Sequence, residues 1–140
     1  MLFFKTILLV DDDLAITYYH KHILGSQNIT NEILVANDLG IAEEILITME
    51  KKTKEELAPS LIFVDVNMPQ YTGFEFIENH KNKFSELKRK GVYTFILTTS
   101  PNPYNLAAFK DTSIIEHFFQ KPLSEKKLEK INELISADLK

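Results

Sequence analysis

The chain has 140 residues, of which 44% are hydrophobic and 26% charged, with four glycines and five prolines. This is the composition of an ordinary globular protein, and the length allows one domain with a real core but not two. A net charge of −4 gives no basic surface for nucleic acid, and the lack of cysteine excludes disulfides, thiolate metal sites and a cysteine nucleophile.

The N-terminal segment is apolar enough to raise the question of a signal peptide or a membrane span. It lacks a basic leading region and a small-residue cleavage site, and the aspartates at 11–13 end it far short of the roughly 18 apolar residues that a span needs. We therefore expect a buried first strand here, no membrane insertion, and a cytoplasmic protein.

Short apolar runs alternate along the chain with longer segments of helical periodicity. Runs of about four to eight apolar residues predict strands, and apolar residues repeating every three or four positions predict one buried face of a helix. The expected strands cover residues 5–10, 31–36, 61–65, 92–99 and 114–119. A helix is expected after each strand, starting near Asp13, Asp38, Thr72, Asn102 and Ser124.

The ends of these helices can also be predicted. The first is expected to bury Ile16, Tyr19 and Ile23 and to close in a left-handed turn at Gly25. After the second helix, the polar run 50–56 should return over the surface. The third is expected to run to about Lys90 with Gly91 as its stop, the fourth to cover 103–110, and the last to bury Leu128, Ile131, Ile135 and Leu139.

Strand and helix thus alternate five times. Right-handed crossovers would then place helices on both faces of a parallel sheet, which is a doubly wound α/β fold, and five units are too few to close an eight-stranded barrel. With no linker or repeat, we expect residues 1–140 to form one domain with no output domain after it.

Four of the expected strands end in polar residues. Asp11, Asp12 and Asp13 follow the first, Asp65 ends the third, Thr98 and Thr99 end the fourth, and Lys121 follows the fifth. Because parallel strands deliver their carboxyl ends to one edge of a sheet, we expect these groups to meet there.

Carboxylates gathered at one edge repel each other unless a cation lies among them. The hard oxygens of Asp11, Asp12 and Asp65 suit Mg²⁺, which keeps waters and accepts a phosphoryl oxygen. Lys121 and Thr98 add an ammonium and a hydroxyl. Together these groups form a site for a transferring phosphoryl group, with a carboxylate nucleophile and donors for the equatorial oxygens.

The motifs VDDD at 10–13 and DVNMPQYTG at 65–73, a threonine ending the fourth strand, and KP at 121–122 occur in one order. In this order and at these distances the chain resembles the receiver domain of bacterial two-component response regulators, over almost its whole length. The resemblance implies a flavodoxin-like (βα)5 fold with strand order 2-1-3-4-5.

The resemblance also implies the role of each matching residue. Asp65 would take a phosphoryl group from a histidine kinase or a histidine phosphotransfer protein. Asp12 would bind Mg²⁺ directly, Asp11 through water, and Asn67 through its backbone carbonyl. Lys121 would pair with the phosphoryl group.

Further roles belong to the response that follows phosphorylation. Thr98 would move toward the phosphoryl group, and Phe118, at the position of the family's switch aromatic, would turn inward. The bond between Lys121 and Pro122 would be cis. The responding face would consist of 103–110, the fifth strand and the last helix, and this face could also support a homodimer.

Some positions depart from the family's pattern. Thr99 stands where the family often has alanine, which crowds the pocket or adds a donor. Thr72 replaces the usual acid before the turn glycine, which should matter little. The loop 100–105 contains two prolines, and the stiffness of this loop bears on the size of any switch motion.

The leading hypothesis is therefore a phosphoacceptor switch that catalyses its own phosphorylation and dephosphorylation and signals to an unknown downstream protein. One alternative is a receiver-like interaction module that never takes phosphate. Another is a Mg²⁺-dependent phosphatase, which needs an acid two residues after the nucleophile, where this chain has Asn67. His20 and His22 are two apart on a helix and so point in different directions, which disfavours a metal pair.

Overall fold

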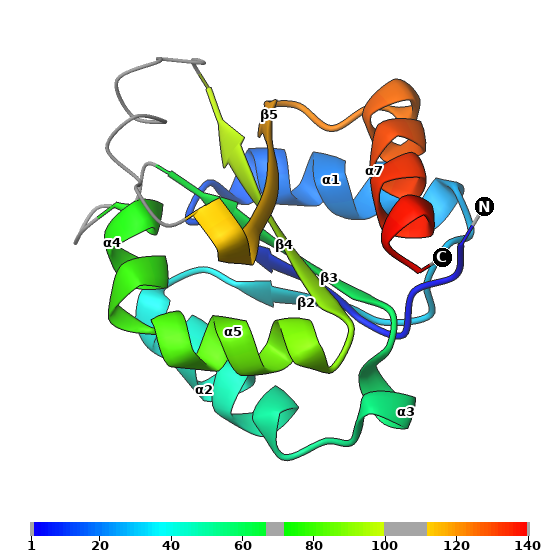
Figure 1. Cartoon of the computed structure of the whole chain (residues 1–140). Coiled ribbons are helices and arrows are strands. Elements are labelled where there is room, and N and C mark those ends of the chain that lie inside the picture. Colours follow the sequence, from blue (N-terminus) through cyan, green and yellow to red (C-terminus); the bar gives the residue numbers. More distant parts are fainter. Residues whose placement is uncertain (1, 67–71, 100–111, 140) are drawn as a thin grey trace.

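Five parallel strands form one twisted sheet at the centre of the molecule (Figure 1). The computed structural model describes residues 2–66, 72–99 and 112–139. The strands are β1 (Ile7–Val10), β2 (Ile33–Ala36), β3 (Ser60–Asp65), β4 (Val92–Thr98) and β5 (Ile115–Gln120). Their order is β2-β1-β3-β4-β5, which confirms the predicted fold class.

Helices cover both faces of this sheet. One face packs against α1 (Leu14–Ser26) and α7 (Glu125–Asp138), and the other against α2 (Leu39–Glu50), α4 (Gly73–Asn79) and α5 (Lys81–Arg89). A short α3 (Lys54–Leu57) precedes β3, and a 3₁₀ turn, η1 (Thr112–Ile114), precedes β5. No helix in the described segments is long and apolar enough to cross a membrane.

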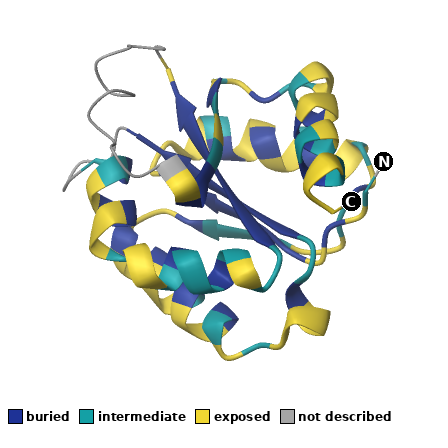
Figure 2. Ribbon diagram, viewed as in Figure 1, coloured by how far each residue is buried: buried dark blue, intermediate teal, exposed yellow. Residues whose placement is uncertain are grey.

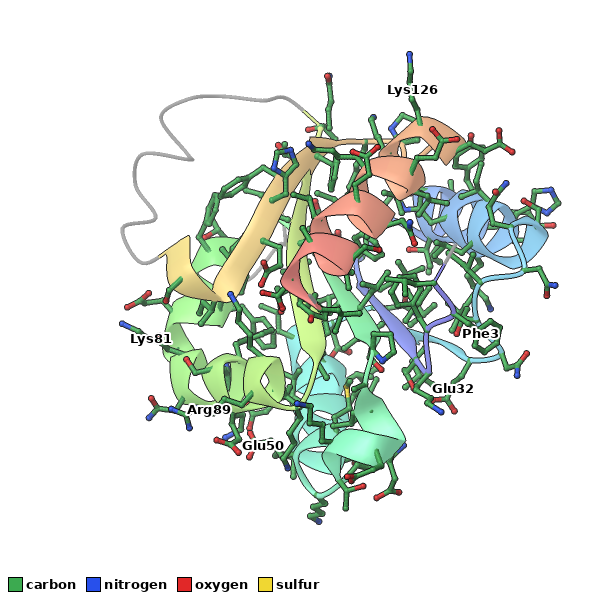
Figure 3. All side chains as sticks on the ribbon, turned by 45° about the vertical axis from the view of Figure 1, so that its right-hand side comes forward. Phe3, Glu32, Glu50, Lys81, Arg89 and Lys126 are labelled. Atoms are coloured by element: carbon green, nitrogen blue, oxygen red, sulfur yellow. The ribbon has the colours of Figure 1, made fainter. Side chains whose placement is uncertain are left out.

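The sheet divides the apolar core in two (Figure 2). Alternate side chains of one strand enter opposite cores, as Leu8 and Leu9 of β1 do. β1, β3 and β4 are buried along their whole length because helices lie above and below them. Charged side chains such as Arg89 and Lys126 point outward instead (Figure 3).

The predicted helix starts are largely confirmed. Asp13 caps α1 by accepting the N–H groups of Ala15 and Ile16 at 3.0 and 3.1 Å. Asp38 caps α2 and Ser124 caps α7 in the same way. Each cap satisfies backbone donors that the first turn of a helix leaves without a partner. The helix predicted at 103–110 lies outside the described residues.

The end and the buried face of α1 differ from the prediction. Gly25 lies inside the helix, and the left-handed residue is Asn28, with a φ of 55°. Asparagine tolerates that conformation, so a glycine is not needed for the turn. The helix also buries Thr17, His20 and Leu24, whereas Tyr19 is 43% exposed. Two polar side chains therefore point into the protein.

The polar run 50–56, predicted to return the chain over the surface, also contains the start of α3. Thr53 and Glu56 form a reciprocal capping box there, and Leu57 anchors the turn in the core. This local pattern is enough to nucleate one helical turn.

The helix predicted from Thr72 to about Lys90 is two helices. They meet at His80, whose φ and ψ of −118° and 27° are not helical. The ring nitrogens of His80 lie 2.9 Å from the carbonyl oxygen of Phe76 and 2.9 Å from a carboxylate oxygen of Glu43 on α2. Gly91 ends α5 with a φ of 81°, as predicted.

Candidate functional site

Two carboxylates lie side by side at the carboxyl edge of the sheet. Asp11 follows β1 and Asp65 ends β3, and these two strands pair directly. Both side chains are buried, each residue being 3% exposed, whereas Asp12 is exposed. One oxygen from each of the three aspartates lies within 4.8 Å of the others. The structure thus brings together the three acids that the sequence predicted to meet.

Local hydrogen bonds fix the orientation of Asp11. Its Oδ1 accepts the N–H of Asp13 at 2.9 Å, and its own N–H donates to the carbonyl of Ala36 on β2 at 3.1 Å. Asp13 is at the same time the cap of α1. Of the three consecutive aspartates, Asp11 and Asp12 therefore contribute carboxylates to the site, and Asp13 starts a helix.

Lys121 joins the two buried carboxylates. Its Nζ lies 2.7 Å from Oδ2 of Asp11 and 3.0 Å from Oδ1 of Asp65, and its side chain is only 7% exposed. Burial by itself lowers the pKa of this ammonium, but the hydrogen bonds and charges of Asp11 and Asp65 outweigh burial and raise the pKa above 10.5. The ammonium therefore stays charged at neutral pH.

The charges of the site do not balance. Three carboxylates face one ammonium within the described residues, and two of these carboxylates are buried. Buried charge of one sign is costly without a counter-ion. A set of oxygen donors with excess negative charge is the chemistry that a hard divalent cation such as Mg²⁺ prefers.

Thr98 is the last residue of β4, the strand next to β3, and it is also buried, at 6% exposure. Its carbonyl oxygen accepts the backbone N–H of Lys121 at 2.7 Å, which connects the end of β4 to the lysine. The next residue, Thr99, is exposed, and its carbonyl accepts a hydrogen bond from the side chain of Gln120. Thr99 thus lies at the rim of the site.

The two aromatic residues of β5 point to opposite faces, as predicted. Phe118 is half-buried, with its ring centroid 6.1 Å from that of Phe74 on α4. Phe119 packs into the opposite core against Phe95. Phe118 is therefore positioned between the fifth strand and the helix that follows the acidic site.

Thr72 stands at the predicted start of a helix and caps α4. Its hydroxyl accepts the N–H of Glu75 at 3.1 Å, and the Glu75 carboxylate returns to Thr72. The following Gly73 donates its N–H to the carbonyl of Val66 at 2.8 Å. A capping-box pattern is visible in the sequence TGFE and could have predicted this. Asn67, the other predicted ligand, lies outside the described residues.

A further contact could not be predicted from the sequence. His20 on α1 accepts the backbone N–H of Leu123 on Nε2 at 3.1 Å. The two residues are 103 positions apart, so no local pattern indicates the bond.

The strand order and this lysine-linked acidic site define a doubly wound α/β domain with polar chemistry at one sheet edge. The chain matches the family model described as the response regulator receiver domain over residues 7–133. It is 30% identical to the response regulator Rcp1 of Synechocystis sp. over 104 residues. The aligned region covers 74% of this chain and 68% of that protein. The chain therefore belongs to the receiver domain family of two-component response regulators.

Solved structures agree with this fold. A two-component response regulator from Cytophaga hutchinsonii superimposes with a TM-score of 0.82 at 24% identity, over 96% of this chain and 98% of that one. A second structure is the receiver domain of the histidine kinase CKI1 from Arabidopsis thaliana, complexed with Mg²⁺ and BeF₃⁻. It superimposes with a TM-score of 0.74 at 19% identity, over 94% of this chain and 90% of that one.

Proposed function

We propose that the protein is a phosphoacceptor switch that takes a phosphoryl group on Asp65 with the help of Mg²⁺. The observation that carries the proposal is the position of the Lys121 ammonium between two buried carboxylates at the sheet edge. Such an arrangement offers a nucleophile and a fixed positive charge within a few ångströms of each other. A structural ion pair needs one carboxylate, and here a second and a third are gathered around it.

The proposed reaction transfers a phosphoryl group from a phosphohistidine of a kinase or a phosphotransfer protein. An oxygen of the Asp65 carboxylate forms a bond to phosphorus, the bond from phosphorus to the donor imidazole nitrogen breaks, and that imidazole takes up a proton. The product is an acyl phosphate on Asp65. Lys121 and the Thr98 hydroxyl would stabilise negative charge on the phosphoryl oxygens.

Asp11, Asp12 and Asp65 would hold the Mg²⁺ ion, and the fit rests on their donor chemistry and closeness. When bound, the ion supplies positive charge that reduces repulsion between the carboxylates and the incoming phosphoryl group. Asn67 stays a prediction as a further ligand. The neighbour from Arabidopsis thaliana was captured with Mg²⁺ and BeF₃⁻, which supports a metal-assisted anion site in a domain of this fold.

The proposed output is a change on the face that contains Phe118. The carbonyl oxygen of Thr98 accepts the backbone N–H of Lys121. If Thr98 shifts toward the phosphoryl group, the end of β5 next to Lys121 therefore moves with it. Phe118 lies three residues before Lys121 and packs on Phe74 of α4, so its ring would report that shift. We expect a downstream protein, or a second copy of this chain, to bind the altered face, and we expect no direct contact with nucleic acid.

The test is intact-mass analysis after incubation with Mg²⁺ and acetyl phosphate, a small phosphodonor that removes the need for a known kinase. We expect one added phosphoryl group on the wild type and none on Asp65→Asn. Asp38→Asn is the matched control, because it makes the same change at a helix cap that asparagine also serves.

Each outcome has a separate meaning. Equal labelling of the wild type and Asp65→Asn would place the phosphoryl group elsewhere and contradict the proposal. No labelling, together with no Mg²⁺ binding, would favour an interaction module that does not use phosphate. Continuous release of phosphate from several monoesters would favour a phosphatase.

A further inference from the structure

Lys121 lies on a short connection, and its reach to Asp11 and Asp65 depends on how that connection is held. The backbone N–H of Lys121 donates to Thr98 on one side. On the other side, Nζ of Lys127 in α7 donates to the carbonyls of Gln120 and Pro122, the latter at 2.8 Å. These bonds fix the start of the connection and the carbonyls that face α7.

The far end of the connection is held by a side chain from a different helix. Nε2 of His20 on α1 accepts the N–H of Leu123 at 3.1 Å. His20 is 1% exposed and Leu123 is fully buried, so water does not replace this bond. A buried N–H without an acceptor is costly, and His20 therefore fixes the place where the chain enters α7.

The bond also defines the state of the ring. Nε2 can accept only if it carries no proton, so the proton of the neutral ring resides on Nδ1. The pKa of His20 is lowered to about 4, mainly because the ring is buried; the charge of Asp11 opposes this shift, and the charges of Lys121 and Lys127 add to it. The ring therefore stays an acceptor at neutral pH.

We propose that His20 is a positioning residue for Lys121, holding the 121–123 connection so that the ammonium lies between Asp11 and Asp65. This inference rests on the role proposed for Lys121, but its first test does not depend on phosphorylation. The hydrogen bond of the His20 ring goes to the backbone of Leu123, and through that backbone His20 acts on Lys121.

The competing explanation is that His20 only fills space in the core under α1. Two substitutions separate the explanations. His20→Leu keeps an apolar side chain of moderate size but has no acceptor. His20→Gln offers a carbonyl oxygen near the position of Nε2. The control is His22→Leu, an exposed histidine of the same helix.

The first measurement is NMR of the protein without Mg²⁺ or phosphodonor. We expect the ¹⁵N shifts of wild-type His20 to show an unprotonated Nε2. We expect the Leu123 amide to shift strongly in His20→Leu, and the Lys121 ammonium signal, assigned by its loss in Lys121→Met, to broaden through faster exchange with water. Both signals should be retained in His20→Gln and His22→Leu. A proton on Nε2, or an unchanged Lys121 signal in His20→Leu, would overturn the proposal.

The second measurement is the rate of labelling with acetyl phosphate. We expect His20→Leu to slow it about five- to tenfold, as for the loss of one neutral hydrogen bond. The same substitution should have no further effect in the Lys121→Met background, because the two residues act as one unit. Equal slowing in both backgrounds would contradict the inference. Failure of the wild type to be labelled would contradict the phosphoacceptor instead, while the NMR result still decides the role of His20.

Discussion

The backbone of Gly73 lies against the carbonyl group of Asp65. A β-carbon placed on Gly73 would come within 2.1 Å of the carbonyl oxygen of Asp65 and 3.0 Å of its carbon. No side chain can relieve this contact by turning away, because the opposing atoms belong to the backbone. The first residue of α4 is therefore packed directly on the residue proposed to take the phosphoryl group.

We predict that Gly73→Ala destabilises the protein by about 1–3 kcal/mol, the usual cost of forcing extra volume into a packed site. Urea denaturation would measure the effect. Gly25→Ala is the control, because nothing lies within 4 Å of the added carbon and alanine favours a helix. It should raise stability by about 0.5–1 kcal/mol. Equal stability of the two variants would show that the contact at Asp65 relaxes freely.

Asp12 and Asp13 are adjacent carboxylates with different expected roles. Asp12 belongs to the acidic cluster, whereas Asp13 caps α1 and can be replaced there by asparagine. A ligand that binds only the folded state stabilises it by about 2.7 kcal/mol at 100 times its dissociation constant. We predict that Mg²⁺ raises the unfolding free energy of the wild type and of Asp13→Asn but has little effect on Asp12→Asn. The measurement is denaturation with and without Mg²⁺, and similar loss in both variants would contradict the assignment.

Acid should weaken the fold through His20. Its pKa is lowered from 6.5 to about 4, so the unfolded chain binds the proton more readily than the folded protein. This contribution to stability is fully present above pH 6.5 and is lost as the pH falls toward 4, by up to roughly 3 kcal/mol. Denaturation curves of the wild type and His20→Gln across this range should therefore converge as the pH falls. Parallel curves would mean that His20 does not titrate in this way.

Lys121→Ala should affect the response more than the transfer. Asp65 and the proposed Mg²⁺ ligands remain, so we expect labelling by acetyl phosphate to persist at a reduced rate. The ammonium that would connect the phosphoryl group to the fifth strand is gone, so the NMR signals of the Phe118 ring should no longer change on labelling. If the Phe118 signals still changed on labelling in this variant, Lys121 would not be needed for the response, and the prediction would be wrong.

The residues at the strand ends explain why so much of the site could be predicted. Asp11, Asp65 and Lys121 each end or follow an apolar run, and parallel pairing takes all such ends to one edge. The phase of α1 could not be predicted in this way. Tyr19 and His20 are neighbours, and only packing against the β5–α7 connection decides that the polar ring turns inward. Similarly, His80 at the break between α4 and α5 contacts Glu43, a partner 37 positions away that no local pattern indicates.

Lys121 and Phe118, close together on β5 and the connection after it, are held by helices on opposite faces of the sheet. The connection that carries Lys121 is tied to α1 and α7 through His20 and Lys127, on one side. Phe118 faces the other side, toward α4. If Asp65 takes a phosphoryl group as proposed, variation in α1 around His20 should change how fast the protein is switched, whereas variation around Phe118 should change which protein reads the signal. The two properties could then diverge independently among relatives with the same chemistry.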